Sequence, residues 1–432
     1  MTLLISIGLL FFLIIVLGSG MRIVFVMALA GLIIAYIVGG YKAIVDIVGY
    51  SCWNSVNSYV LISIPLFVLM ADIIMRIGVA DIAYKAITSW VYVLPGRLLV
   101  TNIVACAVFA SISGSSVATA LTIGNVAIPA QRAKGYKDSF ICGTIAAGGT
   151  LGILIPPSIP FIIYGSMVEE SVGRLFIAGI IPGIILALLF VLYIVFNSIL
   201  RGDMAPPSTD TYSWRDRLNS IKSLLPILFL LFMIMGSLYS GIATATEAAG
   251  MGVLGALIIA AAYRKLSFNL LKESFVHTVR ASSWLLFLLV GAMILGYGLS
   301  LAGVPRAIAK IIAESGIPYL GIIVLLVAMY IFLGGIMDSL AMLIITMPIV
   351  HPILLAIGAD LIWFGVLMVL LMEAGLLTPP VAMNLFVVRG ISGVDLNEVI
   401  RGATPYVVIL LIMIGIIIAF PILATWLPSH MY

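Results

Sequence analysis

The sequence predicts an all-α polytopic membrane protein that is built from an inverted-topology repeat. The chain of 432 residues is 63% hydrophobic and 9% charged. A soluble domain carries about 25% charged residues, so a water-facing globule is excluded. Apolar runs of about 17–25 residues, each long enough to cross a bilayer, recur from one end of the chain to the other. A set of landmark residues also recurs at a fixed distance along the sequence.

Ten single spans can be placed on the apolar runs. The first run has neither a basic n-region nor a small-residue cleavage site, so we interpret it as a retained span and not as a signal peptide. The predicted spans are 3–18, 22–40, 58–75, 139–168, 174–200, 223–241, 244–262, 281–300, 361–388 and 404–427.

Two further apolar blocks, 98–131 and 320–354, are each interrupted near the middle, by SISGSSVATA (111–120) and by GGIMDSLAML (334–343). At about 1.5 Å per residue, one continuous helix over either block would reach about 50 Å. That length does not fit a hydrocarbon core of about 30 Å. We therefore expect two re-entrant hairpins, whose non-helical tips are buried in protein or line a wet cavity.

The distribution of basic residues supports this layout. With the N-terminus outside, 17 of the 21 Lys and Arg residues fall in cytoplasmic segments. This is the bias that the positive-inside rule predicts, and a full span in place of either hairpin would destroy it. Both termini are then expected on the periplasmic side. The polar stretch 201–222 is expected to be a cytoplasmic linker between two halves.

Landmarks in the two halves align at one constant offset without a gap. The proline pair Pro156-Pro157 recurs as Pro379-Pro380. Further residues recur at this same offset, at Phe109 and Phe332, Ser116 and Ser339, Pro129 and Pro352, Gly152 and Gly375, Gly179 and Gly402, and Pro182 and Pro405. Because a proline pair removes two backbone donors, it should break the helices at 139–168 and 361–388. The charge distribution places the two copies in opposite orientations, as in many secondary transporters.

These features give a predicted domain organisation. Residues 1–97 hold N-terminal scaffold spans and an interfacial arm at 76–97, and residues 98–200 form the first repeat core, with hairpin 98–131 and broken helix 139–168. After the linker, residues 223–319 hold scaffold spans and a second arm. Residues 320–432 form the second repeat core, with hairpin 320–354, broken helix 361–388 and the C-terminal span.

The oxygen atoms at the four breaks are candidate ligands. Loose carbonyls and hydroxyls suit a small hard cation, and helix N-termini suit an anionic group. Asp338 stands out, because a buried Asp costs at least about 2.5–3.5 kcal/mol at the centre of a membrane helix. We expect it to ligate a cation, to cap the second leg of its hairpin, or both. For each serine at the tips, a hydroxyl that only packs between helices is the alternative. Of the other acids within predicted spans, Glu373 is expected to have a structural role, such as bracing the second proline break, and Glu247 is left without one.

Four stretches carry a resemblance to a known family. They are SISGSSVATALTIGNVAIPAQRAKGY, GTLGILIPPSIPFIIYG, TEAAGMGVL and EAGLLTPPVAMNLFVV. With these motifs the chain resembles, over essentially its whole length, the large membrane (M, DctM-like) subunit of tripartite ATP-independent periplasmic (TRAP) transporters of bacteria.

The resemblance implies sodium-driven uptake of an organic acid by an elevator-type transporter fold in the bacterial inner membrane. It also implies two partners, a small four-helix membrane subunit (Q) and a periplasmic substrate-binding protein (P). The implied sodium ligands are Ser113, Gly114, Ser115, Ser116, Gly152 and Pro156 at one site, and Gly335, Asp338, Ser339, Thr378 and Pro379 at the other. The implied substrate-binding residues, between the hairpin tips, are Ser115, Thr119, Ser158, Asp338 and Asn384.

The substrate and the class of transporter leave alternatives. Many dicarboxylate-type members carry Asp where Thr119 stands, so the chain resembles the sialic-acid branch more closely than the C4-dicarboxylate branch. A stand-alone sodium/organic anion symporter of the same superfamily and a passive channel are other transport hypotheses. An intramembrane aspartyl protease is disfavoured, because it needs two carboxylates that share a proton and no second motif matches GGIMDS.

Overall fold

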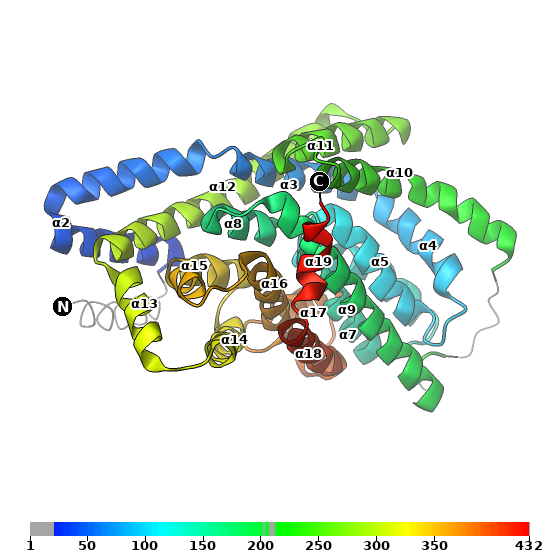
Figure 1. Ribbon diagram of the computed structural model, residues 1–432. Helices are drawn as coiled ribbons and strands as arrows, with labels where there is room; N and C mark the ends of the chain where they lie inside the picture. The colour runs from blue at the N-terminus through cyan, green and yellow to red at the C-terminus, as the bar shows by residue number, and fades with distance from the viewer. Residues whose placement is uncertain (1–20, 202–203, 207–211, 432) are drawn as a thin grey trace.

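The computed structural model describes residues 21–201, 204–206 and 212–431, and the regular elements in these ranges are helices (Figure 1). Nine helices of the described part are long and apolar enough to cross a membrane. The first predicted span, 3–18, lies outside the described residues. The all-helical prediction is confirmed.

The N-terminal scaffold begins with α2 (Ile23–Val56), which bends at Gly40. Gly40 has φ of 69° and ψ of −165°, a conformation that favours glycine, and it lies where the span predicted at 22–40 ends. The short η1 (Val60–Ile62) and α3 (Ser63–Arg76) follow, in agreement with the span predicted at 58–75. α2 packs along α12 (Phe268–Leu301), and the two helices run side by side at one edge of the molecule (Figure 1).

The first repeat core consists of five helices: α5 (Leu98–Ser113), α6 (Ser116–Arg132), α7 (Asp138–Leu154), α8 (Ile159–Val168) and α9 (Val172–Arg201). Nε2 of Gln131, at the end of α6, donates to the carbonyl oxygen of Leu98, at the start of α5, over 3.2 Å. The two ends of the block therefore meet, and the first hairpin is confirmed. Its tip turns at Gly114, with φ of 58°. The proline pair Pro156-Pro157 separates α7 from α8, as predicted.

The second repeat core begins with α14 (Tyr319–Ile336) and α15 (Ser339–Ala356). The hydroxyls of Tyr330 and Thr346 lie 2.6 Å apart, at equal distances in sequence from Asp338, so the two legs run antiparallel and the second hairpin is confirmed. The next helices are α16 (Leu361–Leu377), α17 (Met383–Ser392), α18 (Leu396–Ala419) and α19 (Ile422–Ser429). The proline pair Pro379-Pro380 lies between α16 and α17.

The structure extends the repeat beyond the landmarks that the sequence offers. Both bounds of α7 map onto those of α16 by the same offset that separates Pro156 from Pro379. At nearly this offset, α4 (Val79–Val91) corresponds to α13 (Val304–Ser315), and α11 (Ala245–Ala262) corresponds to the part of α2 before its bend. Scaffold, arm and core are thus all duplicated. Only α10 (Trp214–Tyr239), between the halves, falls outside this correspondence among the described helices.

The two copies are held together by a close helix crossing. α7 of the first copy packs on α18 of the second, and a Cβ atom built on Gly143 would lie 2.2 Å from the carbonyl oxygen of Gly402. A Cβ atom on Gly402 would lie 2.0 Å from the carbonyl oxygen of Ser139. Glycine on both helices therefore permits backbone-to-backbone contact at this crossing, as small residues do between membrane helices.

Several predicted bounds need correction. The span at 281–300 belongs to a longer helix, because α12 begins at Phe268 with a Ser267 N-cap. The C-terminal span at 404–427 is two helices, which Phe420 and Pro421 separate. The linker predicted at 201–222 becomes helical at Trp214, where Ser213 and Asp216 form a capping box.

The arm predicted at 76–97 is embedded more deeply than a surface helix. Eight of the thirteen residues of α4 are buried. The hydroxyl of Tyr84 on α4 donates to Oδ1 of Asn102 over 2.9 Å, and Nε2 of Gln131 donates to the Tyr84 hydroxyl over 2.9 Å. These bonds join the arm to the open end of the first hairpin.

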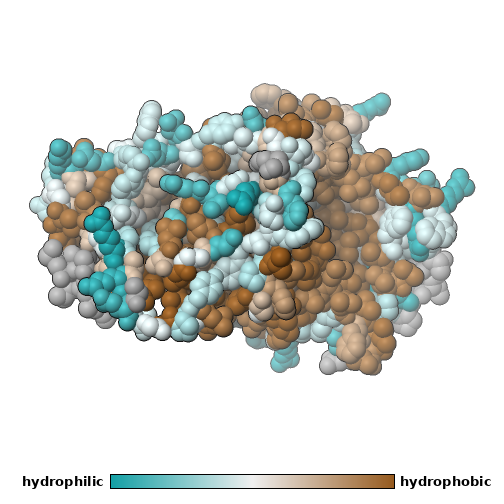
Figure 2. Space-filling model, in the orientation of Figure 1, coloured by the Kyte–Doolittle hydropathy of each residue, from teal (hydrophilic) through white to brown (hydrophobic). Residues whose placement is uncertain are grey.

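Much of the molecular surface is apolar (Figure 2). Figure 2 shows continuous brown surface on the side where Figure 1 draws α9 and α10. Leu188 and Leu192 on α9, and Phe229 and Phe232 on α10, are exposed. An apolar patch of this extent on span-length helices is the surface that lipid tails cover.

Candidate functional site

The first candidate site forms where the tip of hairpin α5–α6 meets the break between α7 and α8. Ser113 and Thr119 hydroxyls lie 2.6 Å apart, and the Thr119 hydroxyl donates to the carbonyl oxygen of Ser115 over 2.8 Å. A Cβ atom on Gly152 would lie 2.6 Å from that same carbonyl oxygen, so the end of α7 packs directly on the tip of hairpin α5–α6. The structure therefore brings the predicted cation-site residues of the first half together.

Glycine is required at position 114 of the first tip by a close contact as well as by its positive φ. A Cβ atom on Gly114 would lie 2.8 Å from the carbonyl oxygen of Pro157. The amide of Ile159, at the start of α8, is 3.5 Å from the carbonyl oxygen of Gly114. The tip and the proline break thus touch through backbone atoms, and several carbonyl oxygens lie within a small volume.

The second candidate site repeats this arrangement in the other half. The amide of Val381, after the second proline pair, donates to the carbonyl oxygen of Gly335 over 3.1 Å. A Cβ atom on Gly335 would lie 3.2 Å from the carbonyl oxygen of Pro379. The tip of hairpin α14–α15 therefore meets the break between α16 and α17, as the tip of hairpin α5–α6 meets the break between α7 and α8.

Asp338 and Ser115 occupy equivalent positions in the repeat, and each is the N-cap of the second leg of its hairpin. Oδ2 of Asp338 accepts hydrogen bonds from the amides of Leu340 and Ala341, over 3.1 and 3.4 Å. The predicted capping role is confirmed. Among the described residues no donor reaches Oδ1 of Asp338, and the side chain is exposed at the tip. One carboxylate oxygen thus remains for a ligand.

Two hydroxyls at the second site are oriented by backbone acceptors. Ser339 donates to the carbonyl oxygen of Met372 over 3.2 Å, and Thr378 donates to that of Ala374 over 2.7 Å. Because each hydroxyl gives its only proton to α16, its oxygen can act only as an acceptor toward a further group. Such oxygens, with nearby carbonyls, suit a cation and not a hydrogen-bond acceptor.

The predicted substrate residues fall into two groups. Ser115 is half-buried and Asp338 is exposed, so both are accessible at the tips. Thr119, Ser158 and Asn384 are fully buried and bonded internally. The Ser158 hydroxyl, for example, donates to the carbonyl oxygen of Ile153. In this conformation these three side chains face the protein interior and support the site without being accessible to a ligand.

Asn384 connects the two halves. Its Nδ2 donates to the Ser116 hydroxyl over 2.7 Å and to the carbonyl oxygen of Ala146 over 3.0 Å. Asn384 lies in the first turn of α17, directly after the second proline break, whereas Ser116 begins the second leg of the first hairpin. The break of one copy therefore supports the tip of the other.

Glu373 is an unexpected feature of the site's interior. The side chain is fully buried in α16, and among the described residues no hydrogen-bond donor reaches either carboxylate oxygen. It does not brace the second proline break by a hydrogen bond. An unpaired buried charge costs several kcal/mol, so we expect the folded protein to carry this group as the neutral acid.

This environment predicts that Glu373→Gln is tolerated. The Gln side chain has the shape of the neutral acid and carries no charge. We therefore expect the melting temperature of the Glu373→Gln protein in detergent to be close to that of the unsubstituted protein. Glu373→Lys should prevent folding, because the ammonium group would be buried without a partner. Size-exclusion chromatography of fluorescent fusions would measure both. Loss of the folded peak with Gln would show that the carboxyl is charged and paired in the membrane.

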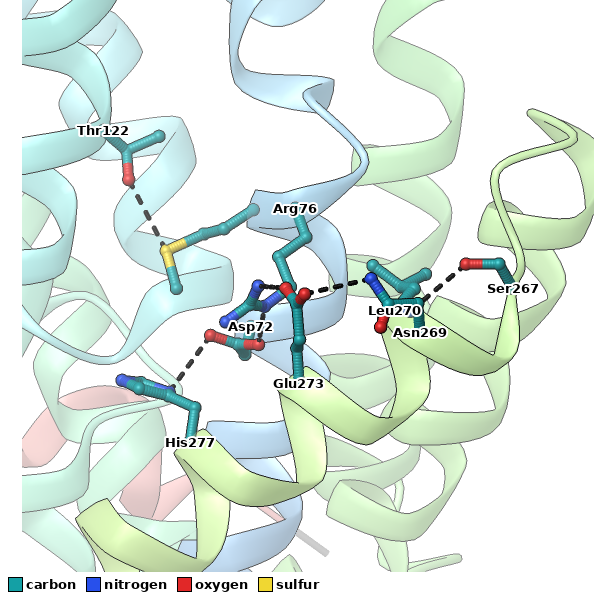
Figure 3. Close-up of polar contacts among 9 residues, drawn as sticks. Asp72, Arg76, Thr122, Ser267, Asn269, Leu270, Glu273 and His277 are labelled. Carbon is teal, nitrogen blue, oxygen red and sulfur yellow. Dashed lines mark hydrogen bonds and ion pairs between the residues drawn. The ribbon is translucent and has the colours of Figure 1, made fainter.

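Sequence reasoning missed a charged cluster between α3 and α12 (Figure 3). Oδ1 of Asp72 lies 3.0 Å from Nδ1 of His277, and Oδ2 of Asp72 lies 2.5 Å from Nε of Arg76. Nη1 of Arg76 lies 2.5 Å from Oε2 of Glu273. The signal was present as an Asp and an Arg one helical turn apart at the end of an apolar helix. The Asp72 carboxylate is almost fully buried, so the cluster joins two scaffold helices.

The sequence left Glu247, in the first part of a predicted span, without a role. Its carboxylate accepts from the amide and the hydroxyl of Thr244, both over 2.8 Å, in the capping box that begins α11. These contacts are exposed. Glu247 therefore has a helix-capping role at the end of the span.

Residues 9–423 match the family model described as tripartite ATP-independent periplasmic transporter, DctM component. The C4-dicarboxylate TRAP transporter large permease protein DctM of Pseudomonas aeruginosa is 35% identical over 373 residues, which is 86% of each chain. The sialic acid TRAP transporter large permease protein SiaM of Vibrio cholerae is 31% identical over 411 residues, which is 95% of this chain and 94% of the relative.

A solved structure has a similar fold. The YdaH transporter of Alcanivorax borkumensis superposes with a TM-score of 0.57 and covers 90% of this chain and 88% of its own. The two sequences are 14% identical, so the likeness concerns the fold alone.

Proposed function

This chain belongs to the DctM-component family of TRAP transporters, whose members are transport permeases and not enzymes, and from that premise we propose that it drives sodium-coupled uptake of an organic acid. It is a multi-pass protein of the inner membrane and a TRAP large permease. The coupling ion, the substrate and the mechanism that follow are our proposals.

The arrangement of oxygens at the two tip-and-break junctions carries the proposal. At the second junction, the hydroxyls of Ser339 and Thr378 donate their protons to α16 and so present lone pairs to a ligand, and Asp338 presents a free carboxylate oxygen. At the first junction, the carbonyl oxygen of Ser115 lies against Gly152. Unwound carbonyls and half-helix ends at the centre of inverted repeats are the groups that bind coupling sodium ions in secondary transporters. One sodium ion at each junction is the minimum that the repeat suggests.

An elevator mechanism fits the packing of the helices. Through Asn384 and the crossing at Gly143 and Gly402, the two repeat cores form one unit. The scaffold helices α2, α3, α11 and α12 pack on one another, and Asp72 and Arg76 join α3 to α12 by ion pairs. We propose that the two repeat cores move as one unit against this scaffold. Substrate and sodium are bound between the hairpin tips and move with this unit.

Two partners complete the proposed system. A periplasmic binding protein would deliver the substrate, and a small four-helix membrane subunit would enlarge the scaffold. Sialic acid is the first proposed substrate, because the family resemblance implies that Thr119 stands where many dicarboxylate-type members carry Asp. A C4-dicarboxylate is the alternative that the DctM relative supports, and the relatives are named for different substrates.

Reconstitution tests the proposal directly. The chain, the small subunit and the binding protein would be placed in proteoliposomes, and uptake of labelled sialic acid or succinate would be followed with and without an inward sodium gradient. We expect saturable uptake that needs all three components and the gradient. Uptake by this chain alone would favour a stand-alone symporter, and non-saturable flux without a gradient would favour a channel. Absence of any sodium dependence would refute the coupling.

A further inference from the structure

A cavity of about 570 Å³ lies between the scaffold and the repeat cores. Its walls come from the second part of α2 and the turn that follows it, from α12, from the end of α8 and from α15. None of the cation-site or substrate-site residues named above is among the described residues that line it. The volume lies within the range of about 300–1,000 Å³ that small-molecule sites occupy.

Three helices end at this cavity. Asn54 of α2, Ser166 of α8 and Ser300 of α12 line it, and each lies in the last turn of its helix. The C-terminal end of a helix carries about half of a negative elementary charge, because its last carbonyl groups have no amide partner within the helix. Three such ends around one cavity favour a positively charged ligand and disfavour an anion.

The charged side chains of the lining act in the same direction. Of the described residues that line the cavity, none is Lys or Arg, and one, Glu169, has a carboxylate. No described residue forms an ion pair or a hydrogen bond with this carboxylate. A cation in the cavity would therefore meet an available carboxylate and no competing charge from Lys or Arg.

Glu169 stands at a position where a glutamate destabilises the fold. It is the C-cap of α8, with φ of 58° and ψ of 32°, in the left-handed region that favours glycine. Its negative charge also lies at the negative end of the helix dipole. No partner among the described residues offsets these two effects. A strained residue that glycine could replace without strain indicates a role other than folding.

The rest of the lining suits an organic cation. The rings of Tyr50 and Tyr297 line the cavity and pack edge-to-face, with centroids 4.8 Å apart and an interplanar angle of 77°. Tyrosine rings attract ammonium groups through their quadrupole. The side chains of Asn54, Ser166 and Ser300 form no hydrogen bond with another described residue, so their oxygens can accept from a ligand. Among the described residues, no group of three or more His, Cys, Asp or Glu side chains could hold a metal ion.

The position of the cavity along α12 places it at one face of the membrane. His277, in the charged cluster of Figure 3, and Ser300, in the cavity wall, are separated by about 34 Å of helix. That distance is close to the thickness of the hydrocarbon core, about 30 Å. The cluster lies at the end where Arg264, Lys265 and Lys272 gather, which the positive-inside rule assigns to the cytoplasm. The cavity therefore lies on the periplasmic side.

Beside the cavity, the scaffold touches the second hairpin. A Cβ atom on Gly296 of α12 would lie 3.4 Å from Cβ of Pro348 on α15. Ser300 lines the cavity from α12, and His351 lines it from α15. A ligand in the cavity would thus contact both sides of the interface along which the repeat cores are proposed to move.

We propose that this cavity binds an organic ammonium cation. Glu169 and the three helix ends attract its charge. Tyr50 and Tyr297 contact the alkyl groups on its nitrogen, and the hydroxyls at the helix ends accept hydrogen bonds from its polar groups. The bound cation joins α12 to α15 and so inhibits movement of the repeat cores. Binding is independent of the proposed uptake function, whereas the inhibition rests on it.

Equilibrium dialysis of labelled choline against the full chain in nanodiscs tests the binding. The lipid would be phosphatidylglycerol, whose head group has no ammonium, and the buffer would be at about pH 8, where imidazole is neutral. The uncharged analogue of choline, in which a quaternary carbon replaces the nitrogen, is the matched control ligand. We expect saturable binding of choline and about tenfold weaker binding of the analogue. Equal binding of the two would overturn the cation, and absence of choline binding to the folded chain would overturn the site.

Two exchanges identify the source of the cation. Sodium in place of potassium at constant ionic strength should leave the Kd for choline unchanged, and a rise would show a sodium site and overturn the organic ligand. Phosphatidylethanolamine, whose head group has an ammonium, would then be added to the nanodiscs. A rise in the Kd for choline would assign the site to a lipid head group, and an unchanged Kd would assign it to a dissolved solute. Both results support the ammonium class.

Substitutions test the residues of the lining. Glu169→Gln should raise the Kd for choline about fivefold or more, because a full charge close to the cation is lost. Glu170→Gln removes the same charge from the next residue, which is not among the described residues of the lining, and should change the Kd little. Tyr297→Leu should raise the Kd about two- to fivefold through loss of a cation–π contact, and Tyr41→Leu, at an exposed position of α2, should not. Equal effects of a variant and its control would contradict the assignment.

Glu169→Gly separates a ligand-binding role from a structural one. Glycine suits the φ of 58° and removes the negative charge from the end of α8. The melting temperature should therefore rise while choline binding falls. A melting temperature that falls together with binding would show that Glu169 serves the fold, and it would contradict the proposal.

Uptake measurements test the inhibition. In proteoliposomes that show sodium-driven uptake, external choline should lower the maximal rate and leave the KM unchanged, because the cavity lies apart from the hairpin tips. Glu169→Gln should remove this effect. Choline that binds but leaves uptake unchanged would overturn the inhibition and leave the site intact. A chain that binds choline but shows no sodium-driven uptake would refute the proposed function and not the site.

Discussion

Replacing Asp338 by Asn is expected to leave the chain folded and to raise the sodium concentration for half-maximal uptake by about 10- to 100-fold. Asn caps a helix about as well as Asp, so the bonds to the amides of Leu340 and Ala341 can be retained. The negative charge is lost, and hydrogen bonds or contacts with a charged group are worth about 1.5–3 kcal/mol. Sodium-dependent uptake in the three-component proteoliposomes would measure the change.

Asp360→Asn is the matched control for this prediction. Asp360 caps α16 through the amide of Trp363 over 2.9 Å, as Asp338 caps α15, and it lies outside the tip-and-break junctions. We expect the control to keep its sodium response. If Asp338→Asn also keeps the wild-type response, Asp338 is a helix cap only and the second cation site must use other oxygens.

The second large effect is expected at the crossing of α7 and α18. Gly143→Ala or Gly402→Ala would place a methyl group within about 2.2 Å of backbone atoms of the other helix. Backbone cannot move aside as a flexible side chain does, so the cost should reach or exceed the upper part of the usual overpacking range, about 3 kcal/mol. We expect loss of the folded peak in size-exclusion chromatography, or a large fall in melting temperature.

Gly415→Ala, on the same helix α18, is the control for the crossing. A Cβ atom on Gly415 meets no atom within 4 Å, so Ala should be neutral or should stabilise the helix by about 0.5–1 kcal/mol. A folded, stable Gly402→Ala protein would show that α7 and α18 separate easily. The crossing would then not hold the two cores together as one moving unit.

Much of the fold could be predicted from the sequence because the chain contains a repeat. A break that is predicted in one half can be checked at the equivalent position in the other half. The proline pairs and the glycines at the tips each mark a break, and the offset that they share distinguishes them from chance. The hairpins follow from length alone, since neither block fits a bilayer as one rod. The bounds of α12 and the bend at Gly40 did not follow, because each helix continues into a more polar stretch, 268–280 or 41–56, that composition separates from the apolar span.

The candidate site was predicted only in part for a similar reason. Residue types identify oxygens near a break, but not whether a side chain faces a ligand or the interior. Ser158 and Asn384 turn inward and bond to the protein, whereas Ser115 and Asp338 remain accessible. Glu373 and Glu247 both lie in apolar surroundings in the sequence, yet one is fully buried without a partner among the described residues and the other caps an exposed helix end. Only packing between distant segments separates these cases.

The bridge from Asn384 to Ser116 has a consequence for the ancestry of the fold. An inverted repeat can arise by fusion of two genes whose product once paired with itself. The position equivalent to Asn384 in the first half is Phe161, which is fully buried, whereas Ser116 has an equivalent serine in Ser339. In a homodimer of the first half, the residue in the place of Asn384 at each junction with Ser116 would be Phe161. The two halves are thus complementary at this junction and not identical.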